Sequence, residues 1–529
     1  MTQLQAVLAV LKGGVWLTPG HVWFVSEGSS TLGAVTIGHG SAHGDGGMAR
    51  SPSTRYPGPR RGELVVPDER KRYTVVSLFS GAMGLDLGME KTGRFELLAC
   101  VEKVPAFCET IRHNHRAGRL PQRLKIFERD ISEFDPAELL AEIGLQPGEV
   151  DVVVGGPPCQ SFSTAGKRRT TQDPRGTLLW HYLRFIRALQ PKFFIMENVR
   201  GLLSAALRHR AIAERPGKGG SPLHPDEMPG SVVRAFAEEL HAATEASYHM
   251  DCFEVNAVNY GAPQLRERAI FIGNRFNSVV DFPDPTHGPA ATGAVPHGGQ
   301  GALFAAADKP REPWCTLGDA LENLRDPHPV RLEFSPRKLA YLSMVPPGSN
   351  WRSLPEAVQK ESMGSAWFAK GGRSGWWRRL SMDLPCPTLV TMPNHASTAL
   401  CHPTEVRALT LREYARIQEF PDDWEICGKA PEQFAQVGNA VPVRLGTVAG
   451  QVVAAEMDRL AERGWRPYAT KPEAFRLIYV QSHVRTRMWY KAGETFVWED
   501  GGENDEAAYS APKTERKVTD IQGAIRHGA

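Results

Sequence analysis

Apolar runs that predict buried strands alternate with helical patterns through residues 73–275. The strand-like runs are rich in β-branched and aliphatic residues, and they are TVVSLFS (74–80), FELLACVE (95–102), VDVVVGG (150–156) and KFFIMENV (192–199). Helical spacing of apolar positions recurs in VPAFCETIRHNH, GTLLWHYLRFIRAL and SVVRAFAEELHAA. This alternation favours an α/β fold with a doubly wound, mostly parallel sheet, whose functional loops follow the carboxyl ends of the strands.

The alternation stops after about Asn274, and the chain then becomes rich in Pro, Gly and Trp. Regular pattern returns in LTLREYARIQEF and in VPVRLGTVAGQVVAAEMDRLAER, where we expect a helix with a proline in its first turn. We therefore predict a poorly defined or disordered N-terminal extension (1–72), an α/β domain (73–275), a smaller irregular domain (276–400), a final helix that returns to the first domain (401–464) and a C-terminal extension (465–529).

Composition is that of a soluble globular protein, with 41% apolar and 23% charged residues and no apolar run long enough to cross a membrane. The start of the chain lacks the features of a secretory signal. Eight scattered cysteines without a CxxC pair fit a reducing compartment, so we expect a cytoplasmic protein. Cys401 precedes His402, but no matching pair lies nearby, and we expect no metal.

Charge is concentrated in one stretch, although the net charge of the chain is only +3. Residues 331–380 contain nine Lys or Arg against three Asp or Glu, together with four tryptophans. Basic residues interleaved with aromatic ones suit a surface that meets nucleic-acid phosphates and bases. The same composition also fits a solvated basic face over a few core tryptophans, and it does not decide between the two.

The segment GGPPCQSFS (155–163) carries the clearest candidate for chemistry. Its Cys159 follows a predicted buried strand on a loop stiffened by two prolines, where an α/β sheet presents catalytic groups. Most lone cysteines are structural, but an ordinary turn at a strand end does not require Pro-Pro-Cys-Gln. We interpret Cys159 as a candidate nucleophile.

Nine sequence blocks, in order, resemble those of the bacterial cytosine-5 DNA methyltransferase family. They are SLFSGAMGLDLG (77–88), the strand end at Glu102, RDIS (129–132), GGPPCQSFS (155–163), DPRGTLL (173–179), MENVRGLL (196–203), NYGAPQLRERAIFIG (259–273), REYARIQEFPDDW (412–424) and QVGNAVPV (436–443). The resemblance spans about 73–275 and 401–460. It implies a Rossmann-like methyltransferase that uses S-adenosyl-L-methionine and releases S-adenosyl-L-homocysteine, with 276–400 as a target-recognition domain.

The reaction explains which residue types are needed. Carbon 5 of cytosine is a poor nucleophile, and a thiolate that adds to carbon 6 makes it nucleophilic enough to take the methyl group. The resemblance implies that Cys159 is this thiolate and that Glu197 contacts ring nitrogen 3, while Asn198 holds the loop. Arg266 and Arg268 alternate along a predicted strand entry, so we expect both on one face, near cytosine oxygen 2 and the flanking phosphate.

A cofactor site is expected at the ends of the first strands. Glu102 lies 21 residues after Gly81, as does the acid that binds ribose hydroxyls in dinucleotide folds. The resemblance implies that Asp130 and Ile131 receive the adenine. The full expected set is Phe79, Gly81, Ala82, Gly84, Glu102, Asp130, Ile131, Pro157, Leu178, Asn439 and Val441.

A target base inside a duplex has to be flipped out before it can react. Loop 161–176 is placed to close over the DNA, and base reading is expected within 276–400. The expected DNA-binding residues are Gln160, Ser163, Lys167, Arg168, Arg169, Gln264, Arg373, Arg378 and Arg379. Segment 207–230 resembles an inserted loop without an assigned role.

The sequence thus predicts a monomeric enzyme that methylates carbon 5 of cytosine within a specific double-stranded DNA sequence. We expect it to protect DNA in a restriction–modification system, beside a separate cognate endonuclease. Two alternatives are a transfer-RNA cytosine-5 methyltransferase and a decayed protein that only binds DNA. The long region 276–400 favours DNA over transfer RNA, and the intact Cys159, Glu197 and Arg268 argue against decay.

Overall fold

The computed structural model describes residues 72–158, 177–288, 311–368 and 373–480, together with four short strands outside these ranges. The chain divides into two compact units, 1–55 and 56–529. In the first unit, β1 (Trp16–Thr18), β2 (His21–Phe24) and β3 (Gly33–Thr36) form an antiparallel three-stranded sheet. The sequence pattern did not predict these strands, and the rest of the expected N-terminal extension lies outside the described residues.

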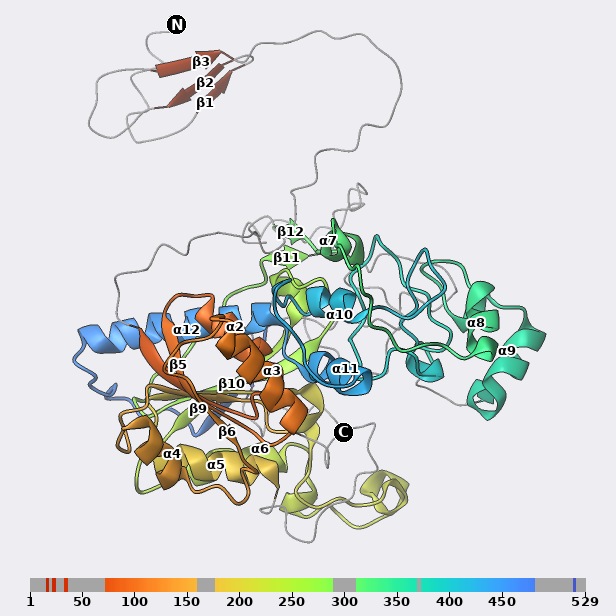
Figure 1. The fold of residues 1–529 in the computed structure, drawn as a ribbon. Helices are drawn as coiled ribbons and strands as arrows, with labels where there is room; N and C mark the ends of the chain where they lie inside the picture. The colour runs from red at the N-terminus through yellow and green to blue at the C-terminus, as the bar shows by residue number, and fades with distance from the viewer. Residues whose placement is uncertain are drawn as a thin grey trace, which may run out of the picture. The chain divides into compact units, whose positions relative to one another are not determined.

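The second unit is built on a nine-stranded sheet with the order β14-β13-β9-β10-β8-β7-β4-β5-β6 (Figure 1). Its strands are β4 (Tyr73–Leu78), β5 (Phe95–Glu102), β6 (Lys125–Glu128), β7 (Val152–Gly155), β8 (Phe193–Val199), β9 (His249–Asn256), β10 (Glu267–Asn274), β13 (Phe475–Tyr479) and β14 (Lys517–Thr519). Strands β6, β5, β4, β7 and β8 are parallel, whereas β10 runs antiparallel to both β8 and β9. The predicted fold class, a mostly parallel α/β sheet, is confirmed.

Helices cover both faces of this sheet (Figure 1). Along β4 and β7, Val75 and Val152 belong to one apolar cluster and Val76 and Val153 to another, as expected from side chains that alternate across a strand. The helices of the first cluster include α2 (Gly84–Glu90), α3 (Pro105–Arg116), α10 (Leu411–Ile417), α11 (Ala430–Asn439) and α12 (Val443–Glu462). Those of the second are α4 (Pro136–Ile143), α5 (Leu178–Leu189) and α6 (Ser231–His241).

The late helix α12 packs directly on α2 of the α/β domain. A Cβ atom built on Gly88 would lie 2.2 Å from the carbonyl oxygen of Val443, and one on Gly446 would lie 2.3 Å from that of Leu85. Two backbones can approach this closely only where both helices lack a side chain. One detail differs from the prediction: Pro442 is the residue before the helix and not part of its first turn.

The C-terminal extension begins inside the same unit. Strand β13 pairs in parallel with β9, and the ring of Trp465 packs edge-on against Tyr73 with a centroid separation of 6.4 Å. Residues 465–480 therefore complete the α/β domain. The polar segment that follows lies outside the described residues, except for β14. Among the described helices, none is both long and apolar enough to cross a membrane.

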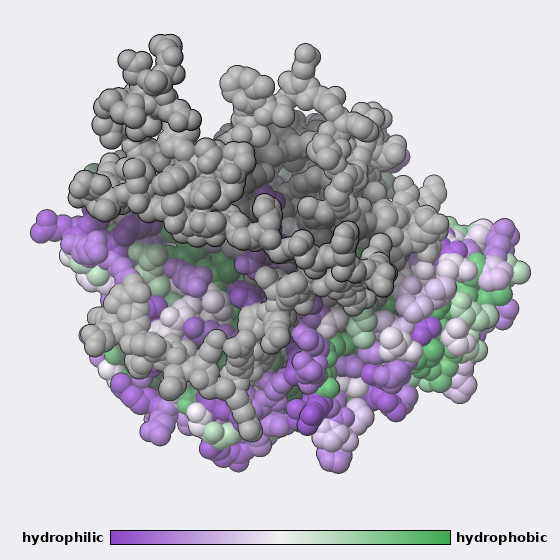
Figure 2. Space-filling model, turned by 90° about the horizontal axis from the view of Figure 1, so that it is seen from above, coloured by the Kyte–Doolittle hydropathy of each residue, from purple (hydrophilic) through white to green (hydrophobic). Residues whose placement is uncertain are grey.

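A smaller lobe has its own apolar cluster, which runs from Phe334 to Ala408 and includes Trp351 and Trp377. Its helices are α8 (Pro336–Ser343) and α9 (Glu356–Met363), whereas α7 (Leu317–Leu321) and the two-residue strands β11 (His287–Gly288) and β12 (Glu312–Pro313) precede it. Hydrophobic residues also gather on the surface at the edge of the molecule where Figure 1 places α8 and α9 (Figure 2). The lobe thus begins later than the predicted boundary at residue 276, because Phe276 and Leu317 pack into the α/β core.

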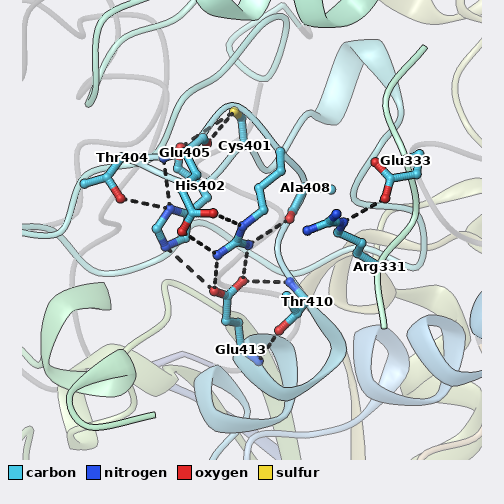
Figure 3. Close-up of polar contacts among 10 residues, drawn as sticks. Arg331, Glu333, Cys401, His402, Thr404, Glu405, Ala408, Thr410 and Glu413 are labelled. Atoms are coloured by element: carbon cyan, nitrogen blue, oxygen red, sulfur yellow. Dashed lines mark hydrogen bonds and ion pairs between the residues drawn. The ribbon is translucent and has the colours of Figure 1, made fainter. Parts of the chain in front are cut away.

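The two ends of the lobe meet at its base, where the backbone N–H of Leu411 donates to the carbonyl of Val330 over 2.8 Å. A charged network braces the returning segment (Figure 3). In it, Arg407 forms ion pairs with Glu405 at 2.9 Å and with Glu413 at 2.8 Å. His402 lies 3.7 Å from the same Glu413 carboxylate, and burial lowers the pKa of this histidine.

Candidate active site

The loop that leads to Cys159 is held by the neighbouring strand. Strands β7 and β8 are parallel, so Gly155 lies beside Met196 and the following residues meet at one edge of the sheet. The side-chain amide of Asn198 donates to the carbonyl of Pro157 over 3.0 Å, which confirms that Asn198 holds this loop. The expected site residues Cys159, Gln160, Ser163, Lys167, Arg168 and Arg169 lie outside the described residues.

Glu197 lies beside this loop because Gly156 leaves room for it. A Cβ atom on Gly156 would lie 3.2 Å from Oε2 of Glu197, closer than almost all real contacts of that kind. A side chain at position 156 would therefore push the carboxylate away. The absence of one leaves room for the Glu197 carboxylate beside the start of this loop.

Glu197 and Arg268 form a buried ion pair. Their strands β8 and β10 are antiparallel, with Val199 opposite Arg268 and Glu197 opposite Ile270, so the two charged side chains are diagonal neighbours on one face. Arg268 Nε lies 2.5 Å from Glu197 Oε1, and the residues are 9% and 8% exposed. A charge-assisted contact of this kind fixes the orientation of both side chains.

Arg266 is more deeply buried than Arg268 and has different hydrogen-bond partners. It is only 2% exposed, and its guanidinium donates to the carbonyls of Leu389 at 3.1 Å and Gly438 at 2.9 Å. Burial, and secondarily the positive charge of Arg268, holds the pKa of Arg266 well below its usual range. We expected Arg266 near cytosine oxygen 2 and the flanking phosphate, but its donors are directed at carbonyls inside the protein.

Gln264 is likewise an internal residue, which corrects its assignment to DNA. It is fully buried, its amide N–H donates to Gln418 over 2.9 Å, and its carbonyl oxygen accepts from the backbone N–H of Leu389 over 2.9 Å. These partners are more than 100 residues away in the chain, so the local pattern could not reveal them. Together with Arg266, they join the base of the smaller lobe to the α/β domain.

The three arginines expected to contact DNA from the lobe differ in accessibility. Arg378 is 7% exposed and donates to the carbonyl of Ala399, so it does not reach DNA as it lies here. Arg379 and Arg373 are half-buried; Arg379 donates to the carbonyl of Val345, while the guanidinium of Arg373 lies 5.0 Å from the ring centre of Trp351. Both of these remain predictions.

The ends of β4, β5 and β6 bring the expected cofactor residues to the same edge. Phe79 and Gly81 adopt left-handed backbone conformations with φ of 58° and 54°, which shape a tight turn after β4. The N–H of Gly81 donates to Oε2 of Glu102 over 3.0 Å, and Oε1 accepts from the N–H groups of Lys103 and Val104, each at 2.9 Å. The turn and the carboxylate therefore form one rigid unit.

The remaining expected cofactor residues surround this unit. Oδ1 of Asp130 accepts from the hydroxyl and the N–H of Ser132 at 2.7 and 2.9 Å, and these bonds, helped by Lys103, lower the pKa of Asp130 to about 2. Ile131 is buried beside it. Pro157 follows β7, and Leu178 is the first residue of α5. Gly84 packs against the carbonyl of Val441. Ala82 and Asn439 lie two residues away from these two in sequence. The carboxylates of Glu102 and Asp130 beside this turn fit a ligand rich in hydroxyl and amino groups.

The sequence pattern did not reveal a buried carboxyl group in the helix that follows the turn of Phe79 and Gly81. Asp86 in α2 is 4% exposed, and its Oδ1 has no hydrogen-bond partner among the described residues. Burial raises its pKa to about 6, although a hydrogen bond with Ser77 opposes this shift. The hydroxyl of Ser80 in the turn donates to the hydroxyl of Ser77 over 2.9 Å. No periodicity in the sequence distinguishes Asp86 from a surface acid.

Asp86→Asn is expected to stabilise the protein at pH 8. The pKa of Asp86 lies above its ordinary value of 3.8, so the stability that this group contributes is complete below about pH 4 and is lost as pH rises through about 6. The variant should gain about 1–3 kcal/mol in free energy of unfolding at pH 8. Urea unfolding at several pH values measures this, and a gain that does not shrink towards pH 4 would contradict the prediction.

Residues 73–454 match the family described as C-5 cytosine-specific DNA methylase. The chain belongs to this family. It is therefore a DNA (cytosine-5-)-methyltransferase, and the family implies S-adenosyl-L-methionine as the methyl donor. This match includes the edge of the sheet where Asn198, Glu197 and Arg268 meet.

Characterised relatives cover most of the same region. The Type II methyltransferase M.Sau96I of Staphylococcus aureus is 36% identical over 383 residues, which are 72% of this chain and 76% of that protein. M.Eco47II of Escherichia coli is 35% identical over 410 residues, covering 75% of this chain and 83% of that protein. A solved structure of the methyltransferase EhMeth of Entamoeba histolytica matches 73% of this chain and 99% of its own, with 10% identity and a TM-score of 0.46.

Proposed function

We propose that this methyltransferase acts on a flipped-out cytosine through a covalent adduct with Cys159. The cysteine sulfur bonds to carbon 6, and carbon 5 then takes the methyl group from the sulfonium donor. Loss of the proton from carbon 5 and release of the sulfur regenerate the aromatic ring and the thiolate. The observation that carries this proposal is the Glu197–Arg268 pair, which lies beside the loop that leads into Cys159.

Glu197 and Arg268 make the ring easier to attack. We assign Glu197 to ring nitrogen 3, where its carboxyl group gives a proton or hydrogen bond to the nitrogen and offsets the negative charge that develops in the ring as the thiolate adds. Arg268 orients this carboxylate through the 2.5 Å contact and directs positive charge towards oxygen 2. Because both groups are buried and already paired, little reorganisation is required when the base arrives.

The donor site lies at the ends of β4 to β7. Glu102 would accept hydrogen bonds from ribose hydroxyls and Asp130 from the adenine amino group, with Ile131 against the ring. The turn of Phe79 and Gly81 would receive the methionine part. This set requires no metal ligand, and the sulfonium supplies an electrophilic methyl group when bound.

Double-stranded DNA is the proposed substrate, and the lobe of residues 331–408 is the proposed reader of its sequence. The family resemblance assigns Gln160, Ser163, Lys167, Arg168 and Arg169 to the segment that closes on the flipped base. Because relatives such as M.Sau96I are Type II methyltransferases, we infer a restriction–modification role beside a separately acting cognate endonuclease. We further propose a cytoplasmic enzyme that acts as a monomer on DNA.

Base-resolution sequencing of 5-methylcytosine tests the function. DNA is taken from a host without its own cytosine-5 methylation that expresses either the wild-type chain or Cys159→Ala. We expect methylation at one short motif with the wild type and none with the variant. Methylation absent from DNA but present in transfer RNA would favour the RNA substrate, and its absence from both would indicate a protein that only binds DNA.

A further inference from the structure

The residue that follows the Glu197-Asn198-Val199 segment is held by two carboxylates on neighbouring strands. Arg200 begins the short 3-10 helix η2 (Arg200–Ser204) at the end of β8. Its Nε lies 2.8 Å from Oε1 of Glu254 in β9, and its Nη1 lies 3.3 Å from Oε2 of Glu267 in β10. One guanidinium thus connects the ends of three adjacent strands.

These contacts close a ring around the catalytic pair. Glu267 accepts from Arg200 through its side chain and from Arg268 Nη1 through its backbone carbonyl, at 2.7 Å. Arg268 in turn pairs with Glu197, and two peptide units connect Glu197 to Val199, beside Arg200. In the sheet register Val199 lies opposite Arg268 and Glu197 lies opposite Ile270, so the ring spans three successive rungs.

The ring joins the two faces of the sheet. Asn198, Ala269 and Glu254 occupy one rung, and Glu197, Ile270 and Phe253 occupy the next. Because side chains alternate across each strand, Glu254 and Glu267 lie on the face opposite to Glu197 and Arg268. Arg200 therefore braces the catalytic pair from behind, where it does not compete with a substrate.

We propose that Arg200 is a positioning residue for methyl transfer, which holds Glu197 and Arg268 in register by tying β8 to β9 and β10. This inference rests on the proposed function, since it assumes that Glu197 and Arg268 contact the cytosine. Small displacements of a catalytic group are costly, because a shift of about 1 Å can slow a reaction by about 10²-fold. Loss of the tie is expected to act through such a shift.

A direct contact between Arg200 and a DNA phosphate is the competing explanation. The side chain of Arg200 is 30% exposed, but its guanidinium lies between a carboxylate that is 6% exposed and another that is 29% exposed. An arginine that leaves these partners for DNA would strand the charge of Glu254 inside the protein. Burial already raises the pKa of Glu254 to about 7, and Arg200 opposes that shift.

The test compares Arg200→Gln, Glu267→Gln and the double variant with the matched control Arg187→Gln. Arg187 also forms an ion pair, at 3.2 Å with Glu245, but on the exposed surface. We expect both single variants to lower the single-turnover methylation rate at saturating DNA by about 10- to 100-fold. DNA affinity should stay within about twofold, the double variant should be no slower than Arg200→Gln, and the control should match the wild type.

Glu197→Gln in the same assay separates this inference from the proposed function. A normal rate in Glu197→Gln would show that Glu197 does not act in catalysis. It would overturn the proposed role of the Glu197–Arg268 pair and, with it, the positioning role of Arg200. A slow Glu197→Gln beside a normal Arg200→Gln would overturn the tie alone. Weakened DNA binding with a normal rate at saturation would assign Arg200 to a phosphate and also overturn it. Should Arg200→Gln fail to fold, Glu267→Gln decides, because it leaves the Arg200–Glu254 pair intact.

Discussion

Cys159→Ala is expected to abolish methyl transfer, with a loss of at least about 10⁴-fold, while DNA and donor binding persist. Alanine cannot add to carbon 6, so carbon 5 keeps the low reactivity of an aromatic ring. The side-chain amide of Asn198 holds the loop at Pro157, and the substitution leaves this contact in place, so we expect the variant to fold. Incorporation of radiolabelled methyl groups measures the rate, and a gel-shift assay measures DNA binding.

Two controls accompany this prediction. Cys427→Ala removes a partly exposed cysteine, whose backbone N–H donates to the hydroxyl of Thr110, and should keep the wild-type rate. DNA with fluorine at carbon 5 of the target cytosine should form a complex with the wild type that survives denaturation, since fluorine blocks the final proton loss. Turnover by Cys159→Ala, or a trapped complex with it, would exclude this cysteine as the nucleophile.

Glu197→Gln should slow methyl transfer by about 10²- to 10³-fold at saturating DNA and donor. An amide cannot supply a proton to ring nitrogen 3, so addition of the sulfur loses its main assistance. The amide can still accept a hydrogen bond from Arg268, and the strand register is unchanged, so DNA affinity should change little. Single-turnover kinetics separate these effects.

The surface variant Glu238→Gln, in an exposed position of α6, is the control for Glu197→Gln. It should be indistinguishable from the wild type. A rate for Glu197→Gln within about threefold of the wild type would show that Glu197 does not activate the cytosine ring. The buried Glu197–Arg268 pair would then have only a structural role.

The α/β domain was predictable because its signals are local. The pattern FELLACVE coincides with β5, and the helical spacing of SVVRAFAEELHAA contains α6. Strand β13 was not predicted, because it pairs with β9 and the paired residues are more than 200 positions apart. Its sequence is a short apolar run near a polar tail, which is too weak a pattern to indicate a strand.

The candidate site was predictable only in part. Family resemblance identified Glu197 and Arg268, and the structure adds that they form a pair. Arg266 and Gln264 point into the protein because they hydrogen-bond to the backbone carbonyl and N–H of Leu389. Leu389 lies more than 100 residues later in the chain, so the local sequence could not show this. Strand alternation alone cannot show whether a polar side chain meets solvent or another segment. The assignments for Cys159 and its loop remain predictions.

The hydrogen bond between Val330 and Leu411 brings the two ends of the lobe together, although the chain between them is about 80 residues long. Recognition could therefore diversify by exchange of the whole lobe, without any change in the span between its ends. One condition limits such grafts. Arg266 and Gln264 hydrogen-bond to the backbone of Leu389. A transplanted lobe therefore has to place an extended segment at that position to keep these contacts. In chimeras without this segment, we expect the lobe and the α/β domain each to fold, but the lobe would no longer position the DNA at the catalytic residues.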